Sequence, residues 1–338
     1  MSRRCVPDVI VVDIFKFINP CGSLHLLYFR DLLINKPSPL PISALISYVA
    51  DADTSILEKF QHVLLSFRFR EKIRILVAQF GSCNTINWFL SKGVTDWNSD
   101  DISTILARRG ELHSLKLMIR ISPYVPLEKI LYTAAKCGRV NIIQVFQMMI
   151  MFEKKIDDEL FQQKYVRKFL EYSALGNQLH VILWMLENYH SETLENADSM
   201  IFGAVRGGHI DMLEWIKANL DWKNLWKHER QKRFRCGIVA ARNARSEQLH
   251  VLQWLQKNRY KFMHRAYVQA AACSGSLEVL QYLRTLDPPC PWSFQVCNIA
   301  VKQGNLEMLK WAISNGCPYQ DEHLLHVSAS KTYAEELW

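Results

Sequence analysis

Hydrophobic residues recur along most of the chain in a pattern that fits two short helices joined by a tight turn. The clearest example is Ala300–Gly316, in which one helix ends at a turn around Gly304 and a second helix follows. In that second helix Leu306, Leu309 and Ile313 fall at helical spacing, and Trp311 lies on the adjoining flank. Such a pair cannot bury its apolar face alone, so the pattern predicts further copies on either side.

The same spacing recurs seven more times, counted from the anchor position that Gly304 occupies in this copy. Apolar residues stand two and five positions after each anchor, and a large apolar or aromatic residue stands seven positions after it. The other anchors are Gly81, Gly110, Gly138, Asn177, Gly208, Glu247 and Gly275. A period near 29 residues, with insertions near 148–164 and 221–235, predicts an all-α solenoid of stacked antiparallel helix pairs.

Small residues precede most anchors, as in Ala134-Ala135, Ala240-Ala241, Ala271-Ala272 and Ala300. We expect them to let neighbouring helices approach closely. A glycine at the anchor takes a positive φ without a Cβ penalty, so it suits the turn between the two helices.

Two copies carry a resemblance to a known family. Ala271–Tyr282 reads AACSGSLEVLQY and Ala204–Trp215 reads AVRGGHIDMLEW, and both resemble the helical part of ankyrin repeats. The resemblance covers roughly Arg70–Trp338. It implies a non-enzymatic scaffold that binds a protein partner on the surface of the repeats.

The chain departs from the common ankyrin pattern in two respects. Its period is shorter than the usual length of about 33 residues, and the Thr-Pro-Leu-His signature is missing. Cys290-Pro291-Trp292 and Cys317-Pro318-Tyr319 stand in its place. We therefore expect the helical stack and leave the β-turn fingers open, with helical-repeat families of longer period as the structural alternative.

The first 69 residues do not follow the repeat. Residues 1–35 contain Val6–Leu33, which resembles an F-box through Pro7, Val9, Ile14, Phe15, Phe17, Ile18, Pro20, Leu24 and Arg30. This resemblance implies a substrate-receptor subunit of a cullin-type ubiquitin ligase, with Pro7, Ile14, Phe15 and Ile18 docking the adaptor; a plain helical cap is the alternative. Residues 36–69 predict a linker and a helical cap or degenerate repeat, and residues 70–338 predict the ankyrin-like array.

Positive charge is concentrated in one part of the chain. Lys217–Arg265 carries 13 lysines and arginines against three carboxylates, whereas the whole chain has a net charge of +8. The densest part is Trp222–Arg235, WKNLWKHERQKRFR, where aromatic and basic residues interleave. Three interpretations stay open: a solvated helix extension, a docking patch for an acidic protein, and a site for nucleic acid or another polyanion.

Aromatic residues fall into two groups. Trp88, Trp184, Trp215, Trp254 and Trp311 share one repeat position and predict core between copies. Those in the connections predict either loop pins or partner contacts. Together with the basic stretch they give these candidate partner-binding residues: Trp97, Trp222, Trp226, Lys227, Arg230, Arg233, Arg235, Trp292 and Tyr319.

No known catalytic, phosphate-binding or metal-binding motif occurs in the sequence, so we expect no enzyme activity, cofactor or metal. The closest group of ligand-type residues, Cys317, His323 and His326, matches no standard zinc spacing. His180 and His250, like His113, recur at one repeat position, which predicts a structural role.

The expected location is intracellular, in the cytoplasm, the nucleus or both, without membrane insertion. Val6–Ile18 is interrupted by Asp8 and Asp13 and is followed by no small-residue cleavage site, unlike a secretory signal. The longest uncharged apolar run, Val140–Phe152, is shorter than the roughly 20 residues that span a bilayer. Nine dispersed cysteines, an odd number, do not suggest a disulfide framework.

Overall fold

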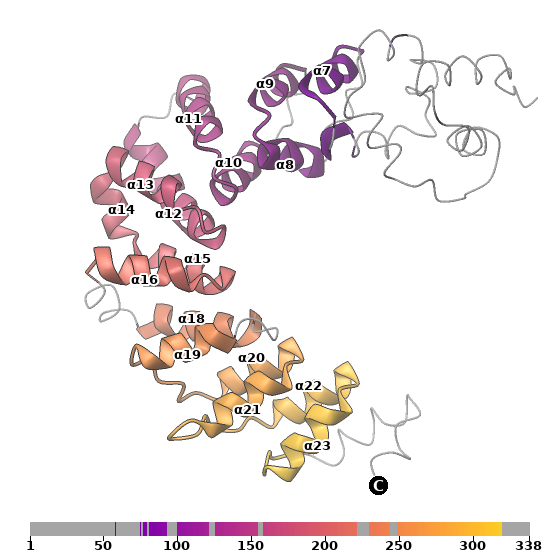
Figure 1. The fold of residues 1–338 in the computed structure, drawn as a ribbon, viewed down its shortest axis with the longest axis vertical. Helices are drawn as coiled ribbons and strands as arrows, with labels where there is room; N and C mark the ends of the chain where they lie inside the picture. Colours follow the sequence, from indigo (N-terminus) through magenta and orange to yellow (C-terminus); the bar gives the residue numbers. More distant parts are fainter. Residues whose placement is uncertain are drawn as a thin grey trace, which may run out of the picture. The chain divides into compact units, whose positions relative to one another are not determined.

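The computed structural model describes residues 58, 75, 77–79, 81–92, 100–121, 126–154, 158–221, 230–243 and 249–319, and only the backbone of 100, 101, 121, 151–154, 158–164 and 230–233. Over these residues the regular secondary structure is entirely α-helical, without a strand (Figure 1). No helix in the described ranges is long and apolar enough to span a bilayer. The chain divides into two compact units, Met1–Ala134 and Ala135–Trp338.

The first unit contains a helix pair and the helix that precedes it. α7 (Cys83–Ser91) begins after Ser82, whose hydroxyl accepts a hydrogen bond from the Thr85 backbone N–H and caps the helix. α8 (Asp100–Arg109) and α9 (Leu112–Ile121) join at Gly110, and α9 packs against both α7 and α8. α10 (Leu127–Lys136) crosses the boundary between the units.

The second unit is a succession of helices, most of them in pairs. Its helices within the described residues are α11 (Val140–Lys154), α12 (Asp158–Leu175), α13 (Leu179–Asn188), α14 (His190–Glu195), α15 (Asp198–Gly207), α16 (Ile210–Asn219), α18 (Arg230–Asn243), α19 (Leu249–Lys257), α20 (Ala266–Ser274), α21 (Leu277–Thr285), α22 (Gln295–Gln303) and α23 (Leu306–Ser314).

The first helices of these pairs lie side by side, since α12 packs on α15, α15 on α18, α18 on α20, and α20 on α22 (Figure 1). Each second helix packs against its own first helix: α13 on α12, α16 on α15, α19 on α18, α21 on α20 and α23 on α22. The alanines that precede the anchors are buried where first helices meet, and they include Ala240, Ala241, Ala271, Ala272 and Ala300. Their burial agrees with the prediction that small residues lie in the contacts between helices.

Positive φ angles occur at the anchors, as the turn chemistry predicts. They are 89° at Gly110, 75° at Gly138, 80° at Gly208, 76° at Gly275 and 69° at Gly304. Asn177 takes the same conformation with a φ of 57°, which asparagine tolerates better than most residues. Gly81 differs, because its φ is not positive. A Cβ there would instead lie 2.5 Å from the Val77 carbonyl oxygen.

The buried stripe of the second helices differs in part from the predicted one. In α23 it consists of Met308, Leu309 and Ala312, which are four, five and eight positions after the anchor. The same three positions are buried in α13, α16, α19 and α21. The prediction is right at the fifth position. It is wrong two positions after the anchor, where Leu306 begins the helix and is only half-buried, and nine positions after it, where Ile313 is also half-buried.

The tryptophans seven positions after the anchors are core residues only in part. Trp88 and Trp254 are buried, whereas Trp184, Trp215 and Trp311 are half-buried. A large indole with a polar N–H is seldom fully enclosed. The Trp254 indole donates a hydrogen bond of 2.5 Å to the Glu214 carboxylate on α16, so this tryptophan links two successive second helices.

Side chains near each turn donate hydrogen bonds to carbonyl oxygens of the preceding turn. Nε2 of His180 lies 2.9 Å from the Gly138 oxygen, and Nε2 of His209 lies 3.0 Å from the Leu175 oxygen. Because a carbonyl oxygen can only accept, Nε2 carries the hydrogen in each case. We call these contacts turn-to-turn hydrogen bonds.

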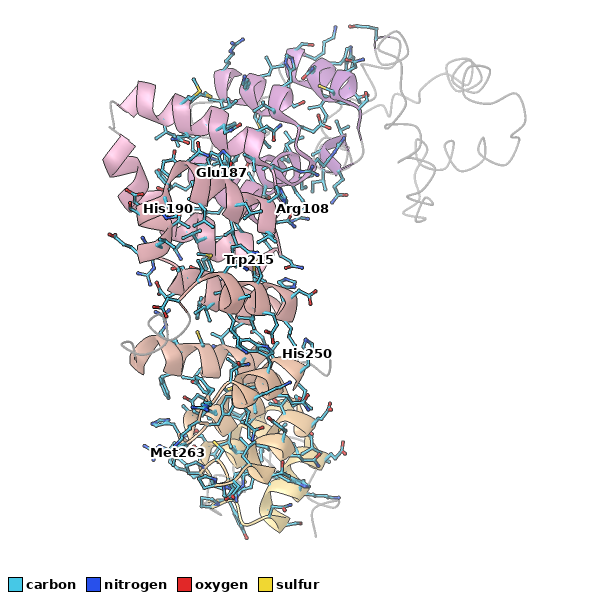
Figure 2. The ribbon with its side chains drawn as sticks, turned by 60° about the vertical axis from the view of Figure 1, so that its left-hand side comes forward. Arg108, Glu187, His190, Trp215, His250 and Met263 are labelled. Atoms are coloured by element: carbon cyan, nitrogen blue, oxygen red, sulfur yellow. The ribbon has the colours of Figure 1, made fainter. Side chains whose placement is uncertain are left out.

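The remaining turn-to-turn hydrogen bonds use other donors at equivalent places: Arg109 to Ala78 and Gly81, Asn243 to Arg206, His250 to Gly208 (Figure 2 labels His250), Gln303 to Cys273, and Asn305 to Gly275. The structural role predicted for His180 and His250 is therefore confirmed.

Candidate binding surface

Many of the candidate residues from the sequence lie outside the described residues. These are Trp97, Trp222, Trp226, Lys227 and the F-box-like positions Pro7, Ile14, Phe15 and Ile18. His323 and His326 also lie outside them. For Arg230 and Arg233 the structure describes only the backbone, which forms the first turn of α18.

Trp292 pins the loop that joins α21 to α22. Its indole nitrogen donates a 3.0 Å hydrogen bond to the Asn315 carbonyl oxygen just beyond α23, and its ring lies 6.0 Å from that of Trp311. The Arg284 guanidinium stacks 4.5 Å from the Trp292 ring centroid. These contacts support the loop-pin interpretation rather than the partner-contact one. Tyr319, at the equivalent place in the next copy, is exposed.

Cys290 and Cys317 hold the same loops from the inside. Both thiols are buried, and each donates to a carbonyl oxygen two residues before a first helix: Cys290 to His264 at 3.4 Å and Cys317 to Ser293 at 3.5 Å. Burial raises the pKa of the Cys290 thiol to about 11. A thiol that stays protonated is a poor nucleophile and metal ligand, so this cysteine is structural.

Arg235 is exposed on α18, and it is the basic residue of Trp222–Arg235 whose side chain the structure describes. Its guanidinium lies 5.4 Å from the ring centroid of Phe202 on α15. This cation–π contact leads from the basic stretch onto the outward faces of the neighbouring first helices.

The outward faces of α12, α15 and α18 form one surface, which we call the first-helix surface. Along α15 it follows Asp198, Phe202 and Arg206, which are one helical turn apart. Its described side chains are Arg167, Lys168, Glu171, Asp198, Phe202, Arg206, Arg235, Ile238, Val239 and Arg242.

The carboxylates of the first-helix surface are little exposed, and each forms an ion pair. Glu171 is 12% exposed and accepts from Lys168 at 2.9 Å and from Arg206 at 3.5 Å. Asp198 is 17% exposed and lies 3.8 Å from Arg167. The cations stand above them, with exposed fractions of 52% for Arg167, 47% for Lys168 and 44% for Arg206. What solvent meets at this surface is therefore mainly positive charge.

Arg235 and Arg242 add two further exposed cations, and neither has an ion pair with another described residue. Guanidinium groups present several N–H donors in a fixed plane, and they bind carboxylates and phosphates in a bidentate manner. The chemistry that this arrangement supports is the binding of an anionic ligand. Among the residues that the structure describes, no group of three or more His, Cys, Asp or Glu could hold a metal ion.

Sequence reasoning found Arg235 but missed Lys168, Phe202, Arg206 and Arg242. A signal existed, because a basic residue stands two positions before several anchors, as Lys136, Arg206 and Lys302 do. Asn243 donates to the Arg206 carbonyl as Gln303 donates to that of Cys273, so Arg242 occupies the same place as Lys302. Arg242 stands five positions before its own anchor, Glu247, instead of two, so the spacing in the sequence conceals the equivalence.

A comparison of the chain with models of known protein families gives no match, and a comparison with curated proteins gives none either.

Proposed function

We propose that this protein is a non-enzymatic scaffold that binds a protein partner on the first-helix surface. In this proposal the helix pairs are divergent ankyrin-type repeats stacked as a solenoid. The second helices hold the stack together, and the first helices present the side chains that a partner contacts.

The observation that carries the proposal is the recurrence of the turn-to-turn hydrogen bonds. Different residue types supply the donor, for example His180, Gln303 and Asn305, yet the acceptor is always a carbonyl of the preceding turn. A repeated connection made by varied side chains is expected of an array in which each unit contacts only its neighbours. Such arrays characteristically bind partners along extended surfaces.

The distribution of polar groups supports binding rather than catalysis. The described buried polar side chains include Ser and Thr that hydrogen-bond to nearby backbone, such as Ser173 to the Phe169 oxygen and Thr193 to the Met185 oxygen. The charged groups lie instead on the outward faces of helices, as at the first-helix surface. A rigid helical scaffold with an exposed charged and aromatic face suits the recognition of a protein.

Site-specific photo-cross-linking tests the proposal. In the full chain expressed in cells, a benzophenone side chain would replace Phe202 on the first-helix surface or Leu183, which is exposed on the second helix α13. We expect a discrete cross-linked protein band from position 202 and little from position 183. Equal cross-linking from both positions, or none from position 202, would count against the proposal.

A further inference from the structure

We propose that the first-helix surface of α12, α15 and α18 recognises an acidic segment of a partner protein, with carboxylates about three residues apart. This inference rests on the proposed function and adds the chemistry of the partner.

Charge is the first argument. Among its described side chains, the surface has two carboxylates, Glu171 and Asp198, and five cations: Arg167, Lys168, Arg206, Arg235 and Arg242. Both carboxylates are little exposed and form ion pairs within the protein, whereas the cations are exposed. A partner therefore meets uncompensated positive charge, and an acidic segment complements it.

Continuity is the second argument, because three separate contacts join the outward faces of adjacent helices. Arg206 of α15 pairs with Glu171 of α12, and Arg235 of α18 stacks over Phe202 of α15. Asn243 at the end of α18 donates a 3.2 Å hydrogen bond to the Arg206 carbonyl oxygen. The cations of the three helices thus belong to one surface.

The spacing of the helices predicts the spacing of the partner's charges. Packed helix axes are about 8–10 Å apart. An extended segment in the polyproline II conformation has three residues per turn and advances about 3.1 Å per residue, so every third side chain lies on one face and would meet the next helix. Acidic residues at that interval would approach Lys168, Arg206 and Arg242 in turn.

The composition of the surface favours a peptide over a nucleic acid. Apolar Phe202, Ile238 and Val239 lie between the arginines. They match the apolar side chains that a peptide places between its carboxylates, and arginine with aromatic residues is typical of protein interfaces. A nucleic acid carries a phosphate at every nucleotide, and Glu171 and Asp198 would oppose such a continuous line of charge.

Fluorescence anisotropy with the full chain tests the inference. The probe is a fluorescein-labelled peptide of about twelve residues that repeats Glu-Leu-Ser, and the control probe repeats Gln-Leu-Ser. The test variant combines Arg206→Glu, Arg235→Glu and Arg242→Glu. The matched control combines Lys257→Glu, Lys261→Glu and Lys310→Glu, which make the same change in net charge at exposed positions outside the surface.

We expect the Glu-Leu-Ser peptide to bind the wild-type chain, and the test variant to bind it at least about tenfold more weakly. The matched control should stay within about twofold of wild type. A second variant with Gln at the three arginine positions should lie between the two. Circular dichroism melts of every variant show that a loss of binding does not come from unfolding.

Three outcomes would overturn the inference: equal affinity for the glutamate and glutamine peptides, equal losses in the test variant and the matched control, and tighter binding of oligo-dT or phosphatidylserine vesicles than of the glutamate peptide. Cross-linking from position 202 separates this inference from the proposed function. A protein cross-link that persists in the test variant keeps the scaffold and rejects the acidic partner. A wild-type chain that gives no cross-link rejects the scaffold, whatever the peptide does.

Discussion

At the scale of single residues, the anchors place the strictest demand on the sequence, since the backbone there has a positive φ. Gly138 and Gly275 share this conformation and differ in their surroundings. A Cβ at Gly275 would have the Gln303 Oε1 atom at an ordinary 3.7 Å, whereas a Cβ at Gly138 would meet the Gln178 Oε1 atom and lie 2.6 Å from the His180 ring. An alanine at Gly275 would therefore report backbone strain alone, whereas an alanine at Gly138 would also have to displace neighbouring side chains.

Alanine substitution at these two glycines should give different losses of unfolding free energy. We expect about 1–2 kcal/mol for Gly275→Ala, from backbone strain alone. Gly138→Ala should cost about 1 kcal/mol more, because the His180 ring must move and lose its turn-to-turn hydrogen bond. Urea denaturation of the full chain measures both. If both substitutions lowered the unfolding free energy equally, the His180 ring would move aside without destabilising the protein.

Tyr260 should make the protein sensitive to alkaline pH. Its hydroxyl is buried 2.9 Å from that of Tyr267, and burial raises the pKa of Tyr260 above its ordinary value of about 10. The folded state holds this proton more tightly than the unfolded state does. Its contribution to stability is therefore complete below pH ~10 and is lost as the pH rises further.

Tyr260→Phe should accordingly reduce the loss of stability above pH ~10, by up to about 1.4 kcal/mol per pH unit. At neutral pH the same variant should lose about 1 kcal/mol, because the hydrogen bond to Tyr267 is gone. Denaturation curves from pH ~8 to ~11 measure the slope. The exposed Tyr319→Phe serves as the control, and a slope identical to wild type in the Tyr260 variant would refute the assignment.

The residue scale also shows what a local pattern can predict. Turn chemistry depends on one residue and its neighbours, so the positive φ at Gly138 or Gly304 was predictable from the sequence. The burial of the tryptophans seven positions after the anchors was less predictable. Trp215 is half-buried and Trp254 is buried, although both fit the same helical period (Figure 2 labels Trp215). The outcome depends on a carboxylate of another copy, Glu214, which no helical period reports.

At the scale of elements, the packing of α12 against α15 sets how closely two first helices approach. A Cβ at Gly203 would lie 2.1 Å from the Glu171 carbonyl oxygen and 3.0 Å from the Ala174 Cβ. Both obstacles belong to a helix that is rigid at this point, so neither can move aside as a flexible side chain would. Glycine at this position is therefore a requirement of the contact.

Gly203→Ala should destabilise the protein by about 3 kcal/mol, since it forces the two helices apart. Chemical denaturation measures the loss, and Ser314→Ala on the exposed end of α23 provides a control of similar size. A loss below about 0.5 kcal/mol would mean that the helices do not touch here. Peptide binding to the first-helix surface should also weaken in the Gly203 variant, because Glu171 and Arg206 would separate.

Elements also explain why the candidate surface escaped prediction. The sequence search found a run of basic residues within one segment, 222–235, most of whose side chains lie outside the described residues. The cations of the first-helix surface, such as Lys168, Arg206 and Arg242, come from three helices, and each helix contributes one or two of them. No window of sequence brings them together, whereas the helix order α12, α15, α18 does.

At the scale of the whole molecule, a stack of helix pairs should respond locally to damage, because each pair depends on its neighbours alone. The consecutive contacts from α12 through α15, α18 and α20 to α22 favour this behaviour. The helical class of the described chain was predictable at this scale from the period of the hydrophobic pattern. The boundary between units near Ala134 was not, because the repeat runs through it unchanged.

Leu280→Ala tests the local response. Leu280 is fully buried in α21, and its truncation should cost about 2–5 kcal/mol. Hydrogen exchange followed by mass spectrometry should show faster exchange in α20, α21 and α22 and little change in α12 and α13. Faster exchange spread evenly over the second unit would indicate a single cooperative core and contradict the stacked-pair proposal.

The turn-to-turn hydrogen bonds have a fixed polarity. In each of them the donor comes later in the chain than the carbonyl that accepts, from Arg109 with Gly81 to Asn305 with Gly275. A chain emerging from the ribosome thus presents every acceptor before its donor is made. Each new helix pair can dock on a finished predecessor during synthesis, and none has to wait for a successor to complete its own turn.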